Sequence, residues 1–386
     1  MGRVKREEPI HGRIEADIQD ADITVKPLTE KENVGGVEDL KGDSVMRGQK
    51  PMSLRRAFFL LPILWLVSPE AFSQDTWREK ARQRWDERRH HSTRQTRRVS
   101  EKGLDYSLEH DGLLRTYRVH LPPHYDKNVP TPVVIYLHGG GGSIKAAYSE
   151  GVDKAADKFG FILIVPAGTG PIPDRLLVWN GGTWGSGECC GSAVQQNIDD
   201  VGFISQMIEE ARAKFNVDGK RIYATGISNG GLMAYRLACE LSDTIAAVAP
   251  VASPGTPSAC TPSKPVSIMH IHGTADPCAP FAGGMGGGCL GTEKHEMLSA
   301  EEDIHQWLII NHCQPNRTTA YQKGNATCIS YESCKDGSGV EFCTVEGMGH
   351  AWPSGSQYLP VKRIGPVSYD ISFDQIWEFF KHHPMK

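Results

Sequence analysis

The stretch "RIYATGISNGGLMAYRLA", residues 221–238, joins an apolar, strand-like run to a run with helical spacing. At the junction stands the pentapeptide GISNG, residues 226–230, in which Ser228 has a glycine two positions to either side. Glycines there allow the chain to turn sharply from strand to helix, so that the serine hydroxyl stands above the end of a sheet. This context predicts that Ser228 is a nucleophile; the alternative is an ordinary residue of a glycine-rich turn.

Apolar runs and helix-like runs alternate along the chain from about Gly103 to the end. Short, continuous apolar runs flanked by helices are typical of strands buried on both faces of a parallel sheet. We therefore expect an α/β fold, with a doubly wound, mostly parallel sheet and helices on both faces, in a single catalytic domain over residues 103–386. The expected strands are 115–122, 131–143, 161–168, 221–228, 245–253, 265–276 and 340–350, and the expected helices 148–160, 199–215, 229–241, 299–312 and 372–383.

A serine hydroxyl is a weak nucleophile at neutral pH and needs a general base that a carboxylate orients. His350 follows a strand-like run in a glycine-bounded loop, and Asp276 follows another buried run just before Pro277. The chain order Ser228, Asp276, His350 is the order of α/β-hydrolases. Asp276 has the alternative of shaping a turn, in which case Asp303, within a helix, is the fallback carboxylate.

The segment LHGGGG, residues 137–142, supplies a candidate oxyanion hole. Glycines after a buried strand let backbone N–H groups approach a developing oxyanion without a side chain in the way. We assign one donor to Gly140 or Gly141 and the other to Asn229. A phosphate-binding loop is disfavoured, because no Lys-Ser/Thr pair follows the glycines.

His270 and His272 alternate with apolar residues on a strand-like run. This placement is typical of structural histidines in a core, so neither is expected to be the general base.

The composition is that of an ordinary globular protein, with 386 residues, 39% hydrophobic residues, 23% charged residues and a net charge of −4. Nothing in this balance indicates a nucleic-acid partner. We expect a monomer that acts on a small or oligomeric ester. The predicted chemistry requires neither a metal nor another cofactor.

Three segments precede the expected catalytic domain. Residues 1–51 are polar and without periodicity, so we expect a disordered extension: either an artefact of the gene model, with translation starting at Met52, or an extension on an uncleaved anchor. Residues 52–73 have the basic start, apolar centre and small-residue end of a signal peptide, and the apolar centre is shorter than the roughly 20 residues of a spanning helix. Residues 74–102 are expected to be a basic, helical or disordered tether. The mature protein is therefore expected to be secreted or periplasmic, without a stable membrane anchor.

All ten cysteines follow the signal-like segment, and none forms a CxxC pair with zinc-ligand spacing. We therefore expect disulfides rather than a metal site. Local closures pair Cys239 with Cys260 and Cys278 with Cys289. Two more lie among Cys313, Cys328, Cys334 and Cys343, with the connectivity left open. The adjacent Cys189 and Cys190 either bond each other or find distant partners.

With these motifs placed, the chain resembles the secreted esterases of the polyhydroxybutyrate depolymerase and feruloyl esterase family of α/β-hydrolases. The stretches that carry the resemblance are "LHGGGGS", "WNGGTWGSGECCGSAVQQNIDDVGF", "RIYATGISNGGLMAYRLACEL", "AAVAPVAS", "IHGTADPCAPFAGG" and "GMGHAWPSG". The resemblance implies that Ser228, Asp276 and His350 form the triad of an enzyme that hydrolyses carboxylic esters. The implied substrates are feruloyl or acetyl esters of plant polysaccharide, or short hydroxyalkanoate polyesters.

The resemblance also directs attention to Trp179 and Trp352 as walls of a substrate pocket, with a packing role as the alternative for each. The insertion-like TWGSGE, residues 183–188, departs from the family pattern and leaves the shape of the pocket open. Two rival functions remain at this stage. One is an exported peptidase of the same fold, and the other an inactive hydrolase fold that serves as a binding protein.

Overall fold

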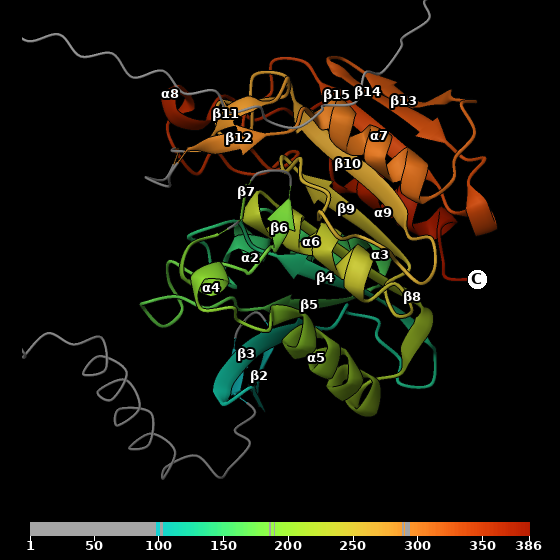
Figure 1. Cartoon of the computed structure of the whole chain (residues 1–386). Coiled ribbons are helices and arrows are strands. Elements are labelled where there is room, and N and C mark those ends of the chain that lie inside the picture. Colours follow the sequence, from blue (N-terminus) through green and yellow to red (C-terminus); the bar gives the residue numbers. More distant parts are fainter. Residues whose placement is uncertain (1–97, 101–102, 185–186, 189, 288, 290–293) are drawn as a thin grey trace, which may run out of the picture. The chain divides into compact units, whose positions relative to one another are not determined.

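A single mixed sheet runs through the part of the chain that the structure describes (Figure 1). The structure is a computed structural model and describes residues 98–386 except 101–102, 185–186, 189, 288 and 290–293. The sheet has eleven strands, in the order β1 (Arg98–Ser100), β2 (Gly103–His110), β3 (Leu113–His120), β5 (Ile162–Pro166), β4 (Thr131–Leu137), β8 (Val217–Ile227), β9 (Ala247–Val251), β10 (Ser267–Gly273), β15 (Val340–Val345), β14 (Ala326–Tyr331) and β13 (Thr318–Lys323).

The strands in the middle of the sheet, from β5 to β15 in that order, are all parallel to their neighbours. Every residue of β4, β5, β9 and β10 is buried, as expected of strands with helices on both sides. The outer strands at both edges pair antiparallel. The predicted α/β class, with a sheet that is parallel at its centre, is therefore confirmed.

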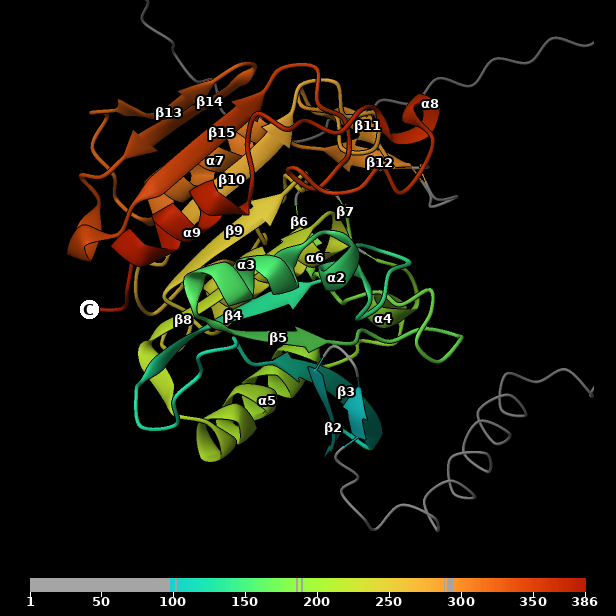
Figure 2. The same ribbon diagram turned by 180° about the vertical axis from the view of Figure 1, so that it is seen from behind.

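Helices cover both faces of the sheet. Buried side chains of α5 (Asp200–Lys214), α6 (Asn229–Glu240) and α7 (Ala300–Ile310) belong to one core cluster on the face seen in Figure 1. Those of α3 (Val152–Phe159) and α9 (Phe373–His382) belong to a second cluster on the opposite face, seen in Figure 2. Two such clusters, one per face, are what a doubly wound sheet requires.

Short elements lie in the connections of the sheet. They are α2 (Ala146–Ser149), α4 (Gly191–Gln195), α8 (Val361–Ile364), the 3₁₀ helix η2 (Lys335–Gly337), and the strand pairs β6 (Thr183–Trp184) with β7 (Gly187–Glu188) and β11 (Gly284–Gly286) with β12 (His295–Met297). No helix among the described residues combines the length and the hydropathy needed to cross a bilayer.

The N-terminal expectations fall mostly on residues that the structure does not describe. The predicted extension 1–51, the predicted signal peptide 52–73 and most of the predicted tether 74–102 lie outside the described residues. The end of the tether segment differs from the expectation, because Arg98–Ser100 forms strand β1 and pairs with β2.

Disulfides stabilise the half of the chain after the elbow serine. They join Cys239 to Cys260, Cys278 to Cys289, Cys313 to Cys334 and Cys328 to Cys343. The two expected local closures are therefore confirmed, and the register of the β14–β15 ladder, which places Cys328 opposite Cys343, explains one of the pairings left open. Cys190 is also disulfide-bonded, whereas Cys189 lies outside the described residues.

Candidate active site

Ser228 occupies a strained turn between a strand and a helix. Strand β8 ends at Ile227, α6 begins at Asn229, and Ser228 between them has φ 57° and ψ −124°. A serine in this region of backbone space costs on the order of 1–3 kcal/mol and persists only where its surroundings enforce it. Here the Ser228 N–H donates to the Val251 carbonyl at 2.9 Å, and the Ser228 carbonyl accepts from the Leu232 N–H at 3.0 Å. The chain therefore places the partly exposed Ser228 where the nucleophile-elbow motif predicts it.

The glycines around Ser228 are required by close packing against strand β4. A Cβ atom at Gly230 would lie 2.1 Å from the carbonyl oxygen of Leu137, and one at Gly226 would lie 2.4 Å from the same oxygen. Real Cβ atoms do not approach backbone oxygens this closely. Both glycines thus allow the elbow to sit directly against the end of β4, where the glycine loop begins.

Asp276 and His350 form a buried pair on the loops after β10 and β15. The Nδ1 atom of His350 lies 2.8 Å from Oδ2 of Asp276. The other carboxylate oxygen accepts hydrogen bonds from the N–H groups of Cys278 at 2.7 Å and Ala279 at 2.9 Å. Burial alone would raise the pKa of the Asp276 carboxyl, but its attraction to His350 and its hydrogen bonds outweigh this, so that the pKa is lowered. An ionised Asp276 holds the proton of His350 on Nδ1 and leaves Nε2 as the basic nitrogen.

The parallel strands bring these three residues to one edge of the sheet. Ser228 follows β8, Asp276 follows β10 and His350 follows β15, and β8, β9, β10 and β15 are consecutive parallel neighbours. Carboxyl ends of parallel strands lie at the same edge of a sheet, which is where ligands bind in open α/β sheets.

The glycine loop after β4 lies beside the elbow, but its two predicted donors differ. The Gly141 N–H already donates to the Leu177 carbonyl at 2.8 Å. The Gly140 N–H makes no hydrogen bond within the described part of the chain, and a Cβ at Gly140 would lie 3.6 Å from the Cβ of Asn229. The structure therefore favours Gly140, with the N–H of Asn229 at the first position of α6, and corrects the assignment of Gly141 as an alternative donor.

His138 is a residue of this loop that sequence reasoning missed. Its Nδ1 is 2.9 Å from the Gly139 carbonyl, which can only accept, and its Nε2 accepts from the Gly168 N–H at 3.1 Å. Burial lowers the pKa of His138 to about 4, so the ring is neutral in this tautomer at physiological pH. His138 thereby connects the glycine loop to Gly168, which is distant in the sequence. Its position directly before the glycines is the sequence feature that could have identified it.

Asn229 connects the elbow to the loop around Trp179 through its side chain. Its Oδ1 accepts from the Trp179 N–H at 2.7 Å, and its Nδ2 donates to the Trp179 carbonyl at 2.9 Å. The Trp179 indole donates to the His138 carbonyl at 3.0 Å. Trp179 is 0% exposed, so its ring is a packing element of the loop and not an open wall of a pocket.

Trp352 is likewise an interior side chain. It is 1% exposed and packs edge-on against Tyr136, with ring centroids 5.3 Å apart. The expected pocket role of Trp352 is thus replaced by the packing role named as its alternative, because the ring belongs to the core cluster that also contains Tyr136.

The fallback carboxylate, Asp303, lies elsewhere. It is buried in α7, where its Oδ1 accepts from the N–H and the hydroxyl of Thr256, both at 2.6 Å. Asp276 and not Asp303 is therefore the partner of His350.

Two clusters of potential metal ligands occur among the described residues, one of Asp276, Cys278 and His350, and one of Cys328, Glu341 and Cys343. Each depends on cysteines that are disulfide-bonded, which removes the thiolates that would bind a metal. Neither donor set therefore fits a metal centre.

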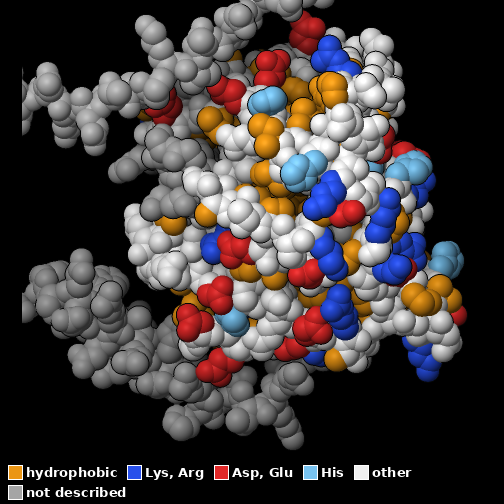
Figure 3. All heavy atoms as spheres, turned by 45° about the vertical axis from the view of Figure 1, so that its right-hand side comes forward, with side chains coloured by type: hydrophobic (Ala, Val, Ile, Leu, Met, Phe, Trp, Pro, Cys, Tyr) orange, Lys and Arg blue, Asp and Glu red, His pale blue; other side chains and the backbone are white. Residues whose placement is uncertain are grey.

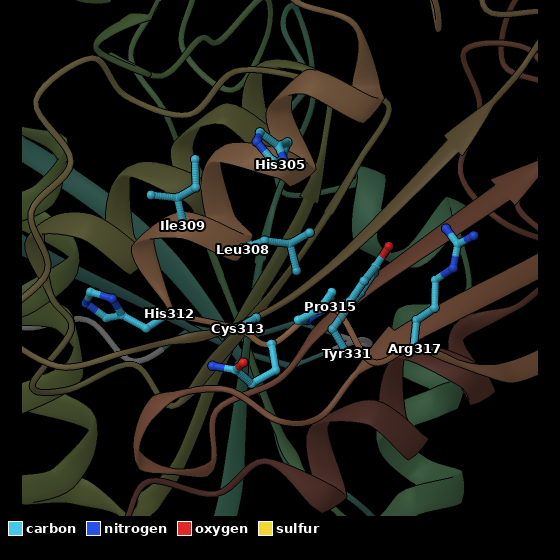
Figure 4. Close-up of a pocket in the computed structure, with 9 residues that line it drawn as sticks. His305, Leu308, Ile309, His312, Cys313, Pro315, Arg317 and Tyr331 are labelled. Carbon is cyan, nitrogen blue, oxygen red and sulfur yellow. The ribbon is translucent and has the colours of Figure 1, made fainter. Parts of the chain in front are cut away.

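A surface groove of about 570 Å³ lies beside α7 (Figure 4). It is lined by His305, Leu308, Ile309, His312, Cys313, Gln314, Pro315, Arg317 and Tyr331. None of these residues belongs to the elbow, the glycine loop or the Asp276–His350 pair, so the groove is not the site of the predicted chemistry.

The serine at a strand–helix turn, the buried Asp–His pair and the parallel central sheet together define the class of α/β-hydrolases. The model of the putative esterase family matches residues 112–279. Feruloyl esterase B of Piromyces equi is 31% identical over 242 residues, which cover 60% of this chain and 42% of that protein. The putative esterase NocK of Nocardia uniformis subsp. tsuyamanensis is 30% identical over 278 residues, covering 68% of this chain and 77% of that protein. A solved acetyl xylan esterase from Aspergillus awamori is similar over 69% of this chain and 94% of its own, with 15% identity and a TM-score of 0.45.

The chain belongs to this esterase family, which includes feruloyl esterases. It spans less than half of the Piromyces protein, at 42% of its length.

Proposed function

We propose that this protein is an exported serine esterase that hydrolyses carboxylic esters through an acyl-enzyme. The observation that carries the proposal is the strained Ser228, which stands at the same sheet edge as the Asp276–His350 pair with its 2.8 Å contact. A backbone outlier of this kind is maintained where function needs it.

In the acylation step, the Ser228 hydroxyl attacks the carbonyl carbon of the ester and Nε2 of His350 takes its proton. The N–H groups of Asn229 and Gly140 hold the oxyanion, and loss of one such donor typically costs about 3–4 kcal/mol of transition-state stabilisation. His350 then gives its proton to the alcohol oxygen as the carbon–oxygen bond breaks. A water molecule hydrolyses the acyl-serine by the same route, which restores the Ser228 hydroxyl.

A small apolar cluster lies one helical turn after the elbow. The buried Leu232 packs there with the partly buried Cys190 and Met297. We propose that the acyl group binds on this side of the elbow, where the accessible parts of Cys190 and Met297 are apolar.

The relatives support the choice of substrate. They include feruloyl esterase B of Piromyces equi, the protein named probable feruloyl esterase C of Aspergillus niger, and the bifunctional acetylxylan esterase/xylanase XynS20E of Neocallimastix patriciarum. We propose feruloyl or acetyl esters of plant polysaccharide as substrates, with short hydroxyalkanoate esters as the second candidate. The disulfides support export, because such bonds persist in oxidising compartments.

A panel of hydrolysis assays tests the proposal. Purified protein and its Ser228→Ala variant are given methyl ferulate, p-nitrophenyl acetate, hydroxybutyrate oligomers and a peptide anilide. The proposal expects ester hydrolysis by the wild type only and no cleavage of the anilide. Cleavage of the anilide at a comparable kcat/KM would indicate the peptidase. A wild type that binds esters without hydrolysing any of them would indicate the inactive binding protein.

A further inference from the structure

A line of buried polar side chains leads from the catalytic carboxylate into the core between the sheet and its helices. His270 and His272 lie on β10, two residues apart and so on the same face, while Tyr235 comes from α6 and Asp303 from α7. All four side chains are 0% exposed. The mechanism proposed above uses none of them, and such a row of buried polar groups is unusual in a hydrophobic core.

Consecutive hydrogen bonds link these groups to the loop of Asp276. The Tyr235 hydroxyl is 2.7 Å from Nδ1 of His270, Nε2 of His270 is 2.9 Å from Nδ1 of His272, and Nε2 of His272 is 2.8 Å from the Ala279 carbonyl. The same Nε2 atom is 3.6 Å from Oδ2 of Asp276.

The Ala279 carbonyl fixes the direction of every hydrogen bond in this line. A carbonyl oxygen can only accept, so Nε2 of His272 must carry a proton. Burial lowers the pKa of both His270 and His272, so each ring is neutral and carries a single N–H. Nδ1 of His272 therefore accepts from Nε2–H of His270, and Nδ1 of His270 accepts from the Tyr235 hydroxyl.

Asp303 lies at the far end of the line, next to Tyr235 and His270. Its Oδ1 is occupied by Thr256, whereas its Oδ2 is buried beside the Tyr235 hydroxyl and lies 3.9 Å from Nδ1 of His270. Tyr235 has one proton, which His270 receives. Burial raises the pKa of Asp303 to about 6, so that below this pH the acid carries a proton that Oδ2 can donate to the tyrosine oxygen.

At its near end, the line of polar side chains is hydrogen-bonded through His272 to the loop that carries Asp276. Ala279 donates its N–H to Oδ1 of Asp276 and accepts from His272 through its carbonyl. Phe281 and Phe342 pack their rings against His272 and His270, so the hydrogen bonds run through an apolar surrounding in which each one is strong. The titratable groups that face the two histidines are Asp276 and His350 on the site side and, on the core side, Tyr235 and Asp303.

We propose that His272 is a positioning residue for Asp276: held in its donating tautomer by His270 and Tyr235, it fixes the Ala279 residue, whose N–H donates to the carboxylate that orients His350. No proton moves along the line, which acts only through its orientation. The inference rests on the proposed role of Asp276 as the carboxylate of the triad.

The test compares His272→Leu, which removes the donor, with His272→Gln, whose amide can still donate to the Ala279 carbonyl. His383→Leu is the matched control, because His383 is also a buried histidine, but one that bonds the Phe379 carbonyl in α9. Melting temperature, kcat, KM and the pH profile of p-nitrophenyl acetate hydrolysis are measured for all of them.

We expect His272→Leu to lower kcat by about 10- to 100-fold with KM nearly unchanged, because a carboxylate out of place misdirects His350. The midpoint of the acid limb of kcat/KM is expected to move to higher pH by up to about one unit, because a carboxylate that loses the well-placed Ala279 N–H attracts the proton on His350 more strongly. His272→Gln should recover most of both effects, and His383→Leu should lower the melting temperature without moving the acid limb.

A folded His272→Leu with the wild-type pH profile, or equal losses in the Leu and Gln variants, would overturn the inference. Should His272→Leu fail to fold, Tyr235→Phe keeps the ring and removes only the hydroxyl. It is expected to shift the acid limb in the same direction by less, and an unchanged profile in that variant would also overturn the inference. Absence of ester hydrolysis by the wild type would instead refute the proposed function itself.

Discussion

The two halves of the candidate site are positioned by different means. The half that holds Ser228, Asn229 and Gly140 is built from backbone: a strained turn, a helix start and a glycine loop in direct contact. The half that holds Asp276 and His350 is built from side chains on long loops, and depends on hydrogen bonds and on a disulfide beside the carboxylate. The first half therefore tolerates no added carbon atom at Gly226 or Gly230, and the second is sensitive to the loss of a single proton donor or acceptor.

The largest expected effect comes from breaking the side-chain half at its centre. Asp276→Asn keeps the shape of the residue, but a neutral amide does not hold the His350 proton on Nδ1, so the imidazole is left in the wrong tautomer. We expect kcat to fall by about 10⁴-fold. The exposed Asp243→Asn is the control and should leave kcat unchanged. Steady-state hydrolysis of p-nitrophenyl acetate measures both, and a loss of less than tenfold in Asp276→Asn would contradict the assigned role.

Breaking the backbone half should act through its geometry. The Cβ in Gly230→Ala would meet the Leu137 carbonyl at 2.1 Å, so the elbow must move. A displacement near 1 Å can cost about 10²-fold in kcat, and we expect a loss of that size together with a lower melting temperature. Gly219→Ala, on β8, has only the end of the Arg212 side chain within 4 Å, at 3.9 Å, and should be close to wild type.

The link between the elbow and the Trp179 loop should matter less. Asn229→Ala keeps the backbone N–H assigned to the oxyanion hole but removes both hydrogen bonds to the Trp179 backbone. We expect unfolding to become easier by about 1–3 kcal/mol, as for buried groups left without partners. The loss in kcat should stay near tenfold. Denaturant unfolding measures the change in stability, and steady-state kinetics measure the change in kcat. A loss of kcat without any loss of stability would contradict the structural role of the two Asn229–Trp179 hydrogen bonds.

The same difference between backbone and side-chain positioning explains which site residues could be predicted from the sequence. Ser228 and its glycines were predictable because a tight turn restricts which residues can occupy adjacent positions. His350 and Asp276 followed from their places after apolar runs. The choice of Gly140 over Gly141 was not predictable, because it depends on the carbonyl of Leu177, which approaches from a distant loop. Similarly, nothing local in the sequence distinguishes a buried Trp179 from an exposed one.

The edges of the sheet show the same limit. The hairpin of β13 and β14 was not expected, because β13 is mostly exposed and carries almost no apolar pattern. The hairpin joins the sheet because β14 pairs with β15. The placement of Cys328 opposite Cys343 can be recognised only once the register of these two strands is known.

The smallest expected effect on kcat is that of a substitution at Asp303, which should instead change the stability of the protein and its dependence on pH. Burial raises the pKa of Asp303 to about 6, whereas an unfolded aspartate titrates near 4. The folded protein therefore binds this proton more tightly than the unfolded chain, and the resulting stability is present below about pH 4 and lost as the pH rises through about 6.

Asp303→Asn mimics the protonated acid at every pH, with an amide that can donate to Tyr235. Relative to the wild type, its free energy of unfolding should rise by up to about 3 kcal/mol between pH 4 and pH 7, with kcat nearly unchanged. Denaturant unfolding of both proteins at several pH values gives the difference. A difference independent of pH would show that folding does not raise the pKa of Asp303 and would contradict this prediction.

Covalent labelling tests directly whether Ser228 is the nucleophile. Wild type, Ser228→Ala and His350→Ala are treated with a fluorophosphonate and examined by intact-protein and peptide mass spectrometry. We expect one adduct per wild-type molecule, on the peptide that contains Ser228, slow labelling of His350→Ala and none of Ser228→Ala. An adduct on another residue, or equal labelling of Ser228→Ala, would contradict this role of Ser228.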